Sequence, residues 1–251
     1  MPPYAEVIGD PIAHSKSPAI HTFWLGKLRI EASYRATRVT DLESYFDLRR
    51  GDPDWRGCNV TAPHKQAVIP FLDEASPIGA VNCIVPDDGR LIGLNTDVDG
   101  VHAALADVDF DKVVLIGAGG AAKAVRAALI DAKEIVAITR RNIKQPGLLA
   151  GATLIVNATP LGMAHAGPMP ETVLAALSSA APWATAFDMV YQPLDTPFLQ
   201  AARAAGLRTV DGLTMLIGQA RKAFRLFFGA EAPAEHDAEL RHLLSEGTGR
   251  I

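Results

Sequence analysis

Polar and ionisable side chains gather at the ends of short apolar runs in the first hundred residues. The segments concerned are residues 59–65, 79–82 and 93–97. In an extended run Asn59 and Thr61 point to the same face, and Lys65 follows just beyond Pro63. A carboxylate beside a lysine holds the ammonium charged or shares its proton, so Lys65 and Asp97 are candidates for acid–base chemistry. Coupled groups titrate as a pair, which leaves the formal proton donor open.

Two serines, Ser15 and Ser17, lie where a helix is predicted to begin. We expect Ser17 to be the N-cap, because Pro18 then supplies the φ favoured at the first helical position. Two hydroxyl donors and the positive end of a helix dipole make a small anion site. A helix that is merely capped would show the same residues, so both interpretations stay open on this segment alone.

A glycine-rich turn lies between the apolar run 113–116 and a helical pattern. Its residues are Gly117, Ala118, Gly119, Gly120, Ala121 and Ala122. Small residues let the backbone approach a pyrophosphate, and the start of the helix adds unpaired N–H groups. The order strand, turn, helix therefore predicts a dinucleotide site, with a tight turn that binds nothing as the alternative.

The residues after the next predicted strand indicate which dinucleotide is bound. An NAD site usually has Asp or Glu there to bond the ribose 2′-hydroxyl. This chain has Thr139, Arg140, Arg141 and Asn142, with Lys144 close behind. Guanidinium groups bind a 2′-phosphate through charge-assisted bonds, whereas a carboxylate repels it. We therefore expect NADP(H) rather than NAD(H), the alternative being a solvated basic turn.

Apolar runs alternate with helical patterns along most of the chain, which predicts an α/β protein. Strands are expected at 5–8, 34–39, 57–60, 80–85, 91–94, 113–116, 135–138, 153–156 and 185–189. The turn at 87–89 predicts that two of these runs form a hairpin. In the first helix Ile20, Phe23, Trp24 and Leu28 are expected on one face, and the pattern after Val210 is helical.

Composition narrows the class of protein. The 251 residues carry 24 Lys+Arg and 28 Asp+Glu, a formal net charge of −4. A pI near 6.0 argues against a nucleic-acid binder, and no apolar run is long enough to span a membrane. Neither the histidines nor Cys58 and Cys83 have a zinc-ligand spacing, so we expect no metal, and the two thiols are expected to be buried. We expect a cytoplasmic protein, since the start of the chain does not read as a signal peptide.

Seven segments in chain order resemble the shikimate dehydrogenase family and are highly specific together. They are GDPIAHSKSPAIH, GCNVTAPHK, GAVN, GLNTD, GAGGAA, DMVYQP and DGLTMLIGQA. The resemblance implies an N-terminal α/β substrate domain and a Rossmann-like NADP-binding domain separated by a cleft. The expected bounds are 1–100 for the substrate domain, 101–210 for the NADP domain and 211–251 for C-terminal helices that pack back on the substrate domain.

The resemblance also implies roles for individual residues. Lys65 and Asp97 match the family's catalytic pair. The implied substrate ligands are Ser15, Ser17, Thr61, Asn82, Tyr191 and Gln219. Met189 and Gly212 would lie against the cofactor, and Arg140 and Arg141 fall where the family binds the 2′-phosphate.

The implied activity is the reversible, NADP-dependent reduction of 3-dehydroshikimate to shikimate by hydride transfer. Cys83 stands where the family usually has Thr, and the stretch between Lys65 and Asn82 is shorter than usual. Quinate or aminoshikimate is therefore an alternative substrate, and a catalytically inactive NADP-binding regulator is an alternative of another class. We expect a small-molecule substrate, no nucleic-acid or membrane partner, and a monomer or homodimer.

Overall fold

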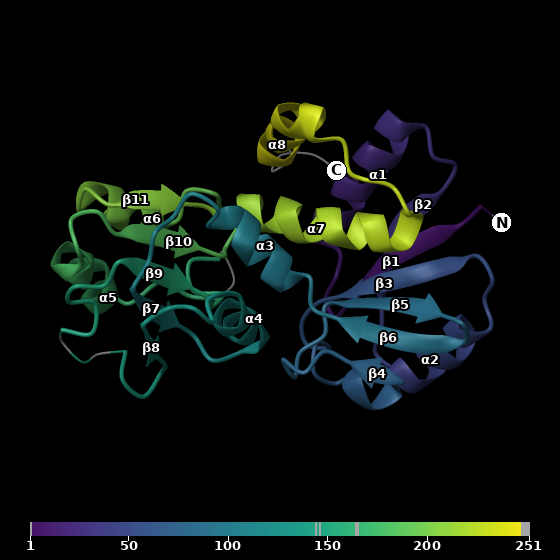
Figure 1. Ribbon diagram of the computed structural model, residues 1–251, viewed down its shortest axis with the longest axis horizontal. Coiled ribbons are helices and arrows are strands. Elements are labelled where there is room, and N and C mark those ends of the chain that lie inside the picture. Colours follow the sequence, from purple (N-terminus) through teal and green to yellow (C-terminus); the bar gives the residue numbers. More distant parts are fainter. Residues whose placement is uncertain (1, 144, 146, 164–165, 247–251) are drawn as a thin grey trace. The chain divides into compact units, whose positions relative to one another are not determined.

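The chain forms two units, each built around its own β-sheet (Figure 1). The computed structural model describes residues 2–143, 145, 147–163 and 166–246, so the predicted phosphate ligand Lys144 lies outside the described residues. Unit 1 comprises Met1–Thr96 and Gln219–Ile251, and unit 2 comprises Asp97–Gly218. Both units mix helices with a largely parallel sheet, which confirms the predicted α/β class.

Unit 1 contains a six-stranded sheet in the order β2-β1-β3-β5-β6-β4. The strands are β1 (Tyr4–Gly9), β2 (Ser33–Arg38), β3 (Trp55–Val60), β4 (Glu74–Ala75), β5 (Cys83–Asp87) and β6 (Arg90–Leu94). β1 pairs in parallel with β2 and β3, whereas β5 runs antiparallel to β3 and β6. The carboxyl ends of β1, β3 and β6 and the amino end of β5 therefore share one edge of the sheet.

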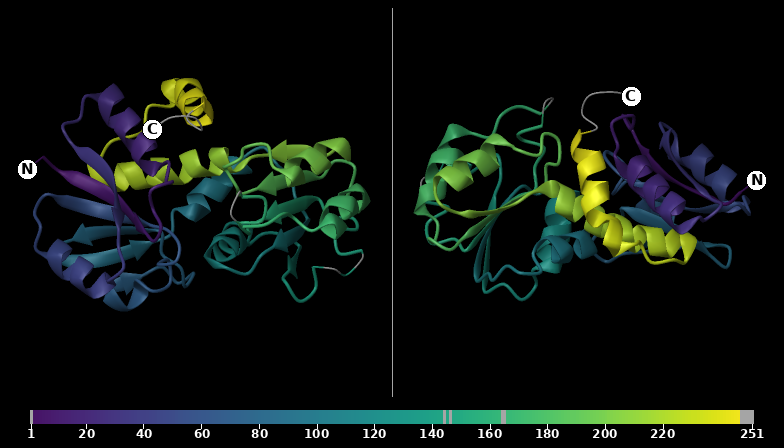
Figure 2. Two further views of the ribbon diagram at one scale, coloured as in Figure 1. Left: turned by 180° about the vertical axis from the view of Figure 1, so that it is seen from behind. Right: turned by 90° about the horizontal axis from the view of Figure 1, so that it is seen from above.

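Helices cover both faces of this sheet. They are α1 (Ser17–Leu28), α2 (Leu42–Arg50), α8 (Asp237–Glu246), the 3₁₀ turns η1 (Ile69–Phe71) and η3 (Ala234–His236), and α7 (Gly212–Phe228) from Gln219 onward. On one face Phe46 and Trp55 belong to an apolar core. On the other, Trp24 of α1 packs edge-on against Phe224 of α7. Figures 1 and 2 show α8 beside α1, where Lys27 and Glu239 form an ion pair of 2.6 Å.

A buried carboxylate lies inside unit 1. Glu6 of β1 is 0% exposed and accepts hydrogen bonds from Arg49 Nε at 2.7 Å, Tyr45 Oη at 2.8 Å and Arg35 Nε at 3.2 Å. Burial raises the pKa of this carboxyl, but hydrogen bonds from Arg49, Thr37 and Tyr45 outweigh it and hold the pKa below its usual value. Glu6 is therefore an ionised group held by donors from several elements.

Unit 2 contains a five-stranded parallel sheet in the order β11-β10-β9-β7-β8. Its strands are β7 (Lys112–Ile116), β8 (Glu134–Ile138), β9 (Leu154–Asn157), β10 (Thr185–Asp188) and β11 (Arg208–Val210). The strand order reverses at β7, which has β8 on one side and β9 on the other. In such sheets ligands bind outside the carboxyl ends of the strands at the point of reversal.

The sheet of unit 2 is apolar on both faces, as a covered parallel sheet requires. Val114 and Ile116 of β7 belong to one core, while Val113 and Leu115 point to the other. The helices of this unit are α3 (Asp97–Ala104), α4 (Gly120–Ala128), α5 (Glu171–Ala176), α6 (Pro197–Ala204), the 3₁₀ turn η2 (Leu177–Ser179) and the first residues of α7. No helix in the described part of the chain is long and apolar enough to cross a membrane.

Two local expectations were wrong. The N-cap of α1 is Lys16, not Ser17, because the helix bonds begin one residue earlier, with Ile20 N donating to Lys16 O at 3.1 Å. The strand expected at 80–85 begins only at Cys83, because Val81 N donates to the carbonyl of Lys65 in a loop.

Candidate functional site

The predicted substrate residues of unit 1 converge on one edge of its sheet. Ser15 and Ser17 follow β1, Thr61 follows β3, and Asn82 directly precedes β5. These are the strand ends that the topology brings together, and the pairs Ile8–Val60 and Asn59–Cys83 fix their register. The fold thus brings together hydroxyl and amide side chains from a stretch of nearly seventy residues.

The segment that carries Ser15 and Ser17 is held by one short-range and one long-range hydrogen bond. Ser15 Oγ accepts a hydrogen bond from Ser17 N at 3.3 Å, and Ser17 is buried. Between them, Lys16 Nζ donates to the carbonyl oxygen of Leu244 at 2.5 Å, near the end of α8. Burial lowers the pKa of Lys16. The C-terminal helix of the chain is therefore fastened to the loop that carries both serines.

Asn82 belongs to a buried reciprocal pair with Thr96. Thr96 N donates to Asn82 Oδ1 at 2.6 Å, and Asn82 Nδ2 donates to Thr96 Oγ1 at 3.0 Å. Thr96 Oγ1 in turn donates to Gln219 Oε1 of α7 at 3.4 Å. Two residues predicted to bind substrate, Asn82 and Gln219, are thereby joined through Thr96, which sequence reasoning missed.

A second missed residue, Tyr34, supports the same group from β2. Its phenolic oxygen donates to Asn59 Oδ1 at 2.7 Å, and Asn59 Nδ2 donates to the main-chain oxygen of Asn82 at 3.1 Å. Burial raises the pKa of Tyr34 well above its usual value, and a hydrogen bond with the Ser17 side chain partly offsets this rise. A buried amide in an apolar strand, as at Asn59, was the available signal for this network.

The predicted catalytic residues Lys65 and Asp97 follow residues of this network in the chain, Lys65 in unit 1 and Asp97 as the first residue of unit 2. Lys65 follows Thr61 in a loop whose backbone is fixed at both ends, since Thr61 N donates to Ile8 O and Val81 N donates to Lys65 O at 2.7 Å. Asp97 is the residue after Thr96 and begins α3. Of the other predicted substrate ligands, Tyr191 lies in unit 2, beyond the end of β10.

A cavity of about 790 Å³ opens in unit 2 at the point where the strand order reverses. Its walls include Gly117, Ala118 and Gly119 after β7, the basic turn after β8, and the residues 159–161 after β9. Gly117 has φ +127° and a Cβ there would stand 2.9 Å from Ala158 O, so glycine is required. Gly119 is the N-cap of α4, and no side chain caps this helix.

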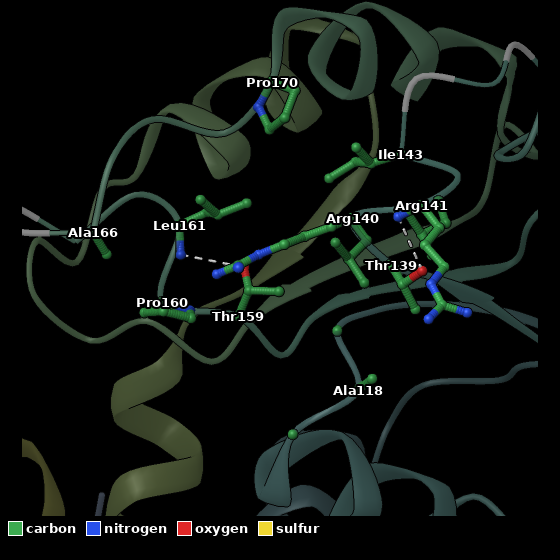
Figure 3. Close-up of a pocket in the computed structure, with 14 residues that line it drawn as sticks. Ala118, Thr139, Arg140, Arg141, Ile143, Thr159, Pro160, Leu161, Ala166 and Pro170 are labelled. Atoms are coloured by element: carbon green, nitrogen blue, oxygen red, sulfur yellow. Dashed lines mark hydrogen bonds between the residues drawn. The ribbon is translucent and has the colours of Figure 1, made fainter. Parts of the chain in front are cut away.

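The basic turn places both arginines on the cavity wall. Figure 3 shows the Arg140 side chain extending toward Thr159 and Leu161, whereas Arg141 turns away from them. Asn142, another residue whose role was missed, holds the turn: its Oδ1 accepts from Thr139 N at 2.6 Å and its Nδ2 donates to Ala137 O at 3.0 Å. A fixed turn presents two guanidinium groups and no carboxylate.

The remaining predicted cofactor residues lie outside the wall of this cavity. Gly120 and Ala121 are the first two residues of α4. Gly212 begins α7 and lies against Met189, where a Cβ would stand 2.5 Å from the Met189 carbonyl oxygen. Cys58 and Cys83 are fully buried in unit 1, as predicted.

A parallel sheet with a glycine turn, an uncapped helix and a basic cavity at its reversal point defines a dinucleotide-binding protein. Residues 7–84 match the family model of the shikimate dehydrogenase substrate binding domain, and residues 212–239 match that of the shikimate 5′-dehydrogenase C-terminal domain. The NADP(+) shikimate dehydrogenase of Sphingopyxis alaskensis is 48% identical, over 96% of this chain and 97% of its own length. The chain belongs to the shikimate dehydrogenase family.

Solved structures agree with this membership. Shikimate 5-dehydrogenase from Thermus thermophilus in complex with NADP(H) and shikimate is 32% identical, with a TM-score of 0.79 over 96% of this chain and 99% of the other. Quinate dehydrogenase from Corynebacterium glutamicum in complex with NAD is also 32% identical, with a TM-score of 0.80 over the same shares. A protein with a different named substrate and cofactor thus shares this fold.

Proposed function

We propose that this chain is an NADP-dependent shikimate dehydrogenase that reversibly reduces 3-dehydroshikimate to shikimate. Unit 1 would bind the substrate and unit 2 the cofactor. The observation that carries the proposal is the cavity of unit 2, in which a glycine turn and Arg140 and Arg141 share one wall. The 48% identity to a named NADP(+) shikimate dehydrogenase supports the same conclusion over nearly the whole chain.

The residues of unit 2 fit a phosphorylated dinucleotide. A Cβ at Gly119 would meet no atom within 4 Å, so the turn leaves open space beside the start of α4. The uncapped helix start suits the pyrophosphate, and the guanidinium groups of Arg140 and Arg141 suit a 2′-phosphate. When bound, NADPH supplies the hydride that reduces the substrate carbonyl.

The residues of unit 1 would bind and orient the cyclohexene ring. The hydroxyls of Ser15 and Ser17 are donors for the substrate carboxylate, next to the start of α1. Thr61, Asn82 and Gln219 would bond the ring hydroxyls. Tyr191, which belongs to unit 2, would be a further ligand near the substrate carboxylate. Buried hydrogen bonds with Thr96 hold the Asn82 side-chain amide, and one from Asn59 holds the Asn82 main-chain oxygen. Such preorganisation lowers the cost of binding.

Lys65 and Asp97 would handle the proton. As an ammonium, Lys65 stabilises the negative charge that develops on the carbonyl oxygen and delivers or relays a proton to it. Asp97 would orient that ammonium and accept a hydrogen bond from a neighbouring substrate hydroxyl. No step assigned to these two residues needs a metal, because the ammonium supplies the positive charge.

Quinate and aminoshikimate are the alternative substrates, since Cys83 leaves no hydroxyl beside Asn82 and a quinate dehydrogenase shares this fold. The test is a grid of steady-state rates with shikimate, quinate and aminoshikimate, each with NADP and NAD. We expect the highest kcat/KM for shikimate with NADP. A maximum for quinate or for NAD overturns the assignment, and no change in NADPH absorbance with any substrate indicates an inactive regulator.

The proposal also includes the cellular location and the oligomeric state of the enzyme. We infer that it works in the cytoplasm as a monomer or homodimer. Light scattering on the purified chain distinguishes these two states from larger assemblies. Cell fractionation with an antibody to the chain tests the location.

A further inference from the structure

A carboxylate with no cationic partner is buried in unit 2. Asp188, the last residue of β10, is 0% exposed and forms no ion pair with any residue that the structure describes. It accepts three hydrogen bonds from neutral donors: Asn157 Nδ2 at 2.9 Å, Val190 N at 3.0 Å and Thr196 Oγ1 at 2.6 Å. Such burial of a charge is costly, and a neutral side chain would suffice for packing alone.

The first of these donors belongs to a side chain that organises the cavity wall. Asn157 ends β9 and is the register partner of Asp188. Its Nδ2 also donates to Leu161 O at 3.1 Å, and its Oδ1 accepts from Thr159 N at 3.1 Å and from Thr159 Oγ1 at 2.6 Å. Thr159 and Leu161 form the wall toward which Arg140 extends in Figure 3.

The other two donors connect Asp188 to the next segments. Val190 follows Met189, whose own N–H donates to Asn157 O at 3.0 Å. Thr196 is the N-cap of α6 and accepts from Leu199 N at 3.2 Å while donating to Asp188. The carboxylate therefore joins the loop after β9, the loop after β10 and the start of α6 in one network.

We propose that Asp188 is a positioning residue for the cofactor: through Asn157, Val190 and Thr196 it sets the distance between the cavity wall at Thr159–Leu161 and the segment after β10 that carries Met189 and leads into α6. The inference rests on the proposed binding of NADPH. A carboxylate serves this purpose because its two oxygens accept all three donors at once, whereas an amide replaces one acceptor by a donor. Burial raises the pKa of Asp188, as expected for a carboxyl without a cation.

The test measures NADPH binding directly, by fluorescence titration of the folded full-length chain. We expect Asp188→Asn to weaken NADPH binding roughly ten- to a hundredfold, the loss corresponding to hydrogen bonds with a charged acceptor. Thr196→Val, which removes the hydroxyl, should weaken binding as well, and Thr196→Ser, which keeps it, should restore wild-type affinity. In the Asp188→Asn background Thr196→Val should weaken NADPH binding little further, because both changes break the same hydrogen bond between Thr196 and Asp188.

The control is Thr153→Val, at the residue that directly precedes β9, away from Asn157 at the other end of the strand. Thr153 Oγ1 accepts from Asp111 N at 2.8 Å and from Lys112 N at 3.2 Å, so this change also removes hydrogen bonds from unit 2. It should lower the melting temperature and leave the NADPH affinity unchanged. If Asp188→Asn and Thr196→Val behave like this control, Asp188 is structural and the inference is wrong. If the wild-type chain does not bind NADPH, the proposed function itself fails.

Discussion

The imidazole of His21 lies flat on the ring of Tyr34, with centroids 4.0 Å apart and planes 5° apart. His21 is 0% exposed, and neither ring nitrogen has a hydrogen-bond partner in the described part of the chain. Burial lowers the pKa of His21 from 6.5 to about 3. The stack supports the residue that holds Asn59, so the neutral form of His21 helps to define the substrate edge of unit 1.

This stack predicts a pH dependence of stability. Between pH 6.5 and 3 the unfolded chain protonates His21 and the folded chain does not, so the free energy of unfolding falls as the pH falls, by up to about 1.4 kcal/mol per pH unit. His21→Phe keeps an aromatic ring and removes the titration. Urea unfolding at pH 7 and pH 5 should show a smaller difference for the variant, and equal differences would contradict the prediction.

Substitutions at two glycines of the same turn should affect folding and cofactor binding separately. Gly117→Ala should destabilise the fold by about 1–3 kcal/mol, because φ is +127° and the new Cβ meets Ala158 O. Gly119→Ala should fold normally, since φ is −81° and no atom lies within 4 Å, yet bind NADPH about tenfold more weakly. Thermal melts and NADPH titrations check both. Wild-type affinity in Gly119→Ala would show that the cofactor does not approach this residue.

The arginines of the basic turn should select the cofactor. We expect Arg141→Asp and Arg140→Ala to raise the KM for NADP roughly ten- to a hundredfold with little change in the KM for NAD. Arg126→Asp, on the exposed side of α4, makes the same change of net charge as Arg141→Asp and is the control. Equal KM values for NADP in Arg141→Asp and wild type would reduce Arg141 to a solvated charge.

Lys65→Ala should lower kcat by about two to four orders of magnitude while the KM for shikimate changes little, because an ammonium that stabilises the developing alkoxide and delivers or relays a proton acts mainly in the transition state. Lys133→Ala, at an exposed lysine that pairs with Asp111, is the matched control and should retain full activity. A variant with near-normal kcat and a raised KM would instead make Lys65 a binding residue.

Local sequence patterns predicted the elements whose residue types by themselves favour one backbone conformation. The turn at 87–89 has Asp88 at φ +46° and Gly89 at φ +77°, and Asp87 pairs with Arg90 across the expected hairpin. The order strand, glycine turn, helix at β7 and α4 was likewise confirmed. Gly117 has a positive φ, which glycine adopts readily, so the glycine in the sequence already indicated the turn.

Long-range contacts account for what the sequence did not predict. Thr96 and Gln219 meet across 123 positions, and Asn157 and Asp188 across 31. Which polar residue is buried depends on strand order, which residue types alone do not specify. The same reason explains the start of α1: Lys16 occupies the N-cap while its side chain bonds a carbonyl 228 residues away.

The buried Glu6 and the donors around it limit which substitutions this sequence can accept. Loss of Arg49 alone leaves a carboxylate in a dry interior without its closest cation, at a cost of about 3–5 kcal/mol. Joint replacement of such a group by apolar residues of matched volume is often close to neutral. Single replacement of Glu6 or of Arg49 should therefore cost more stability than replacement of both, so a change at one of the two positions favours a second change at the other.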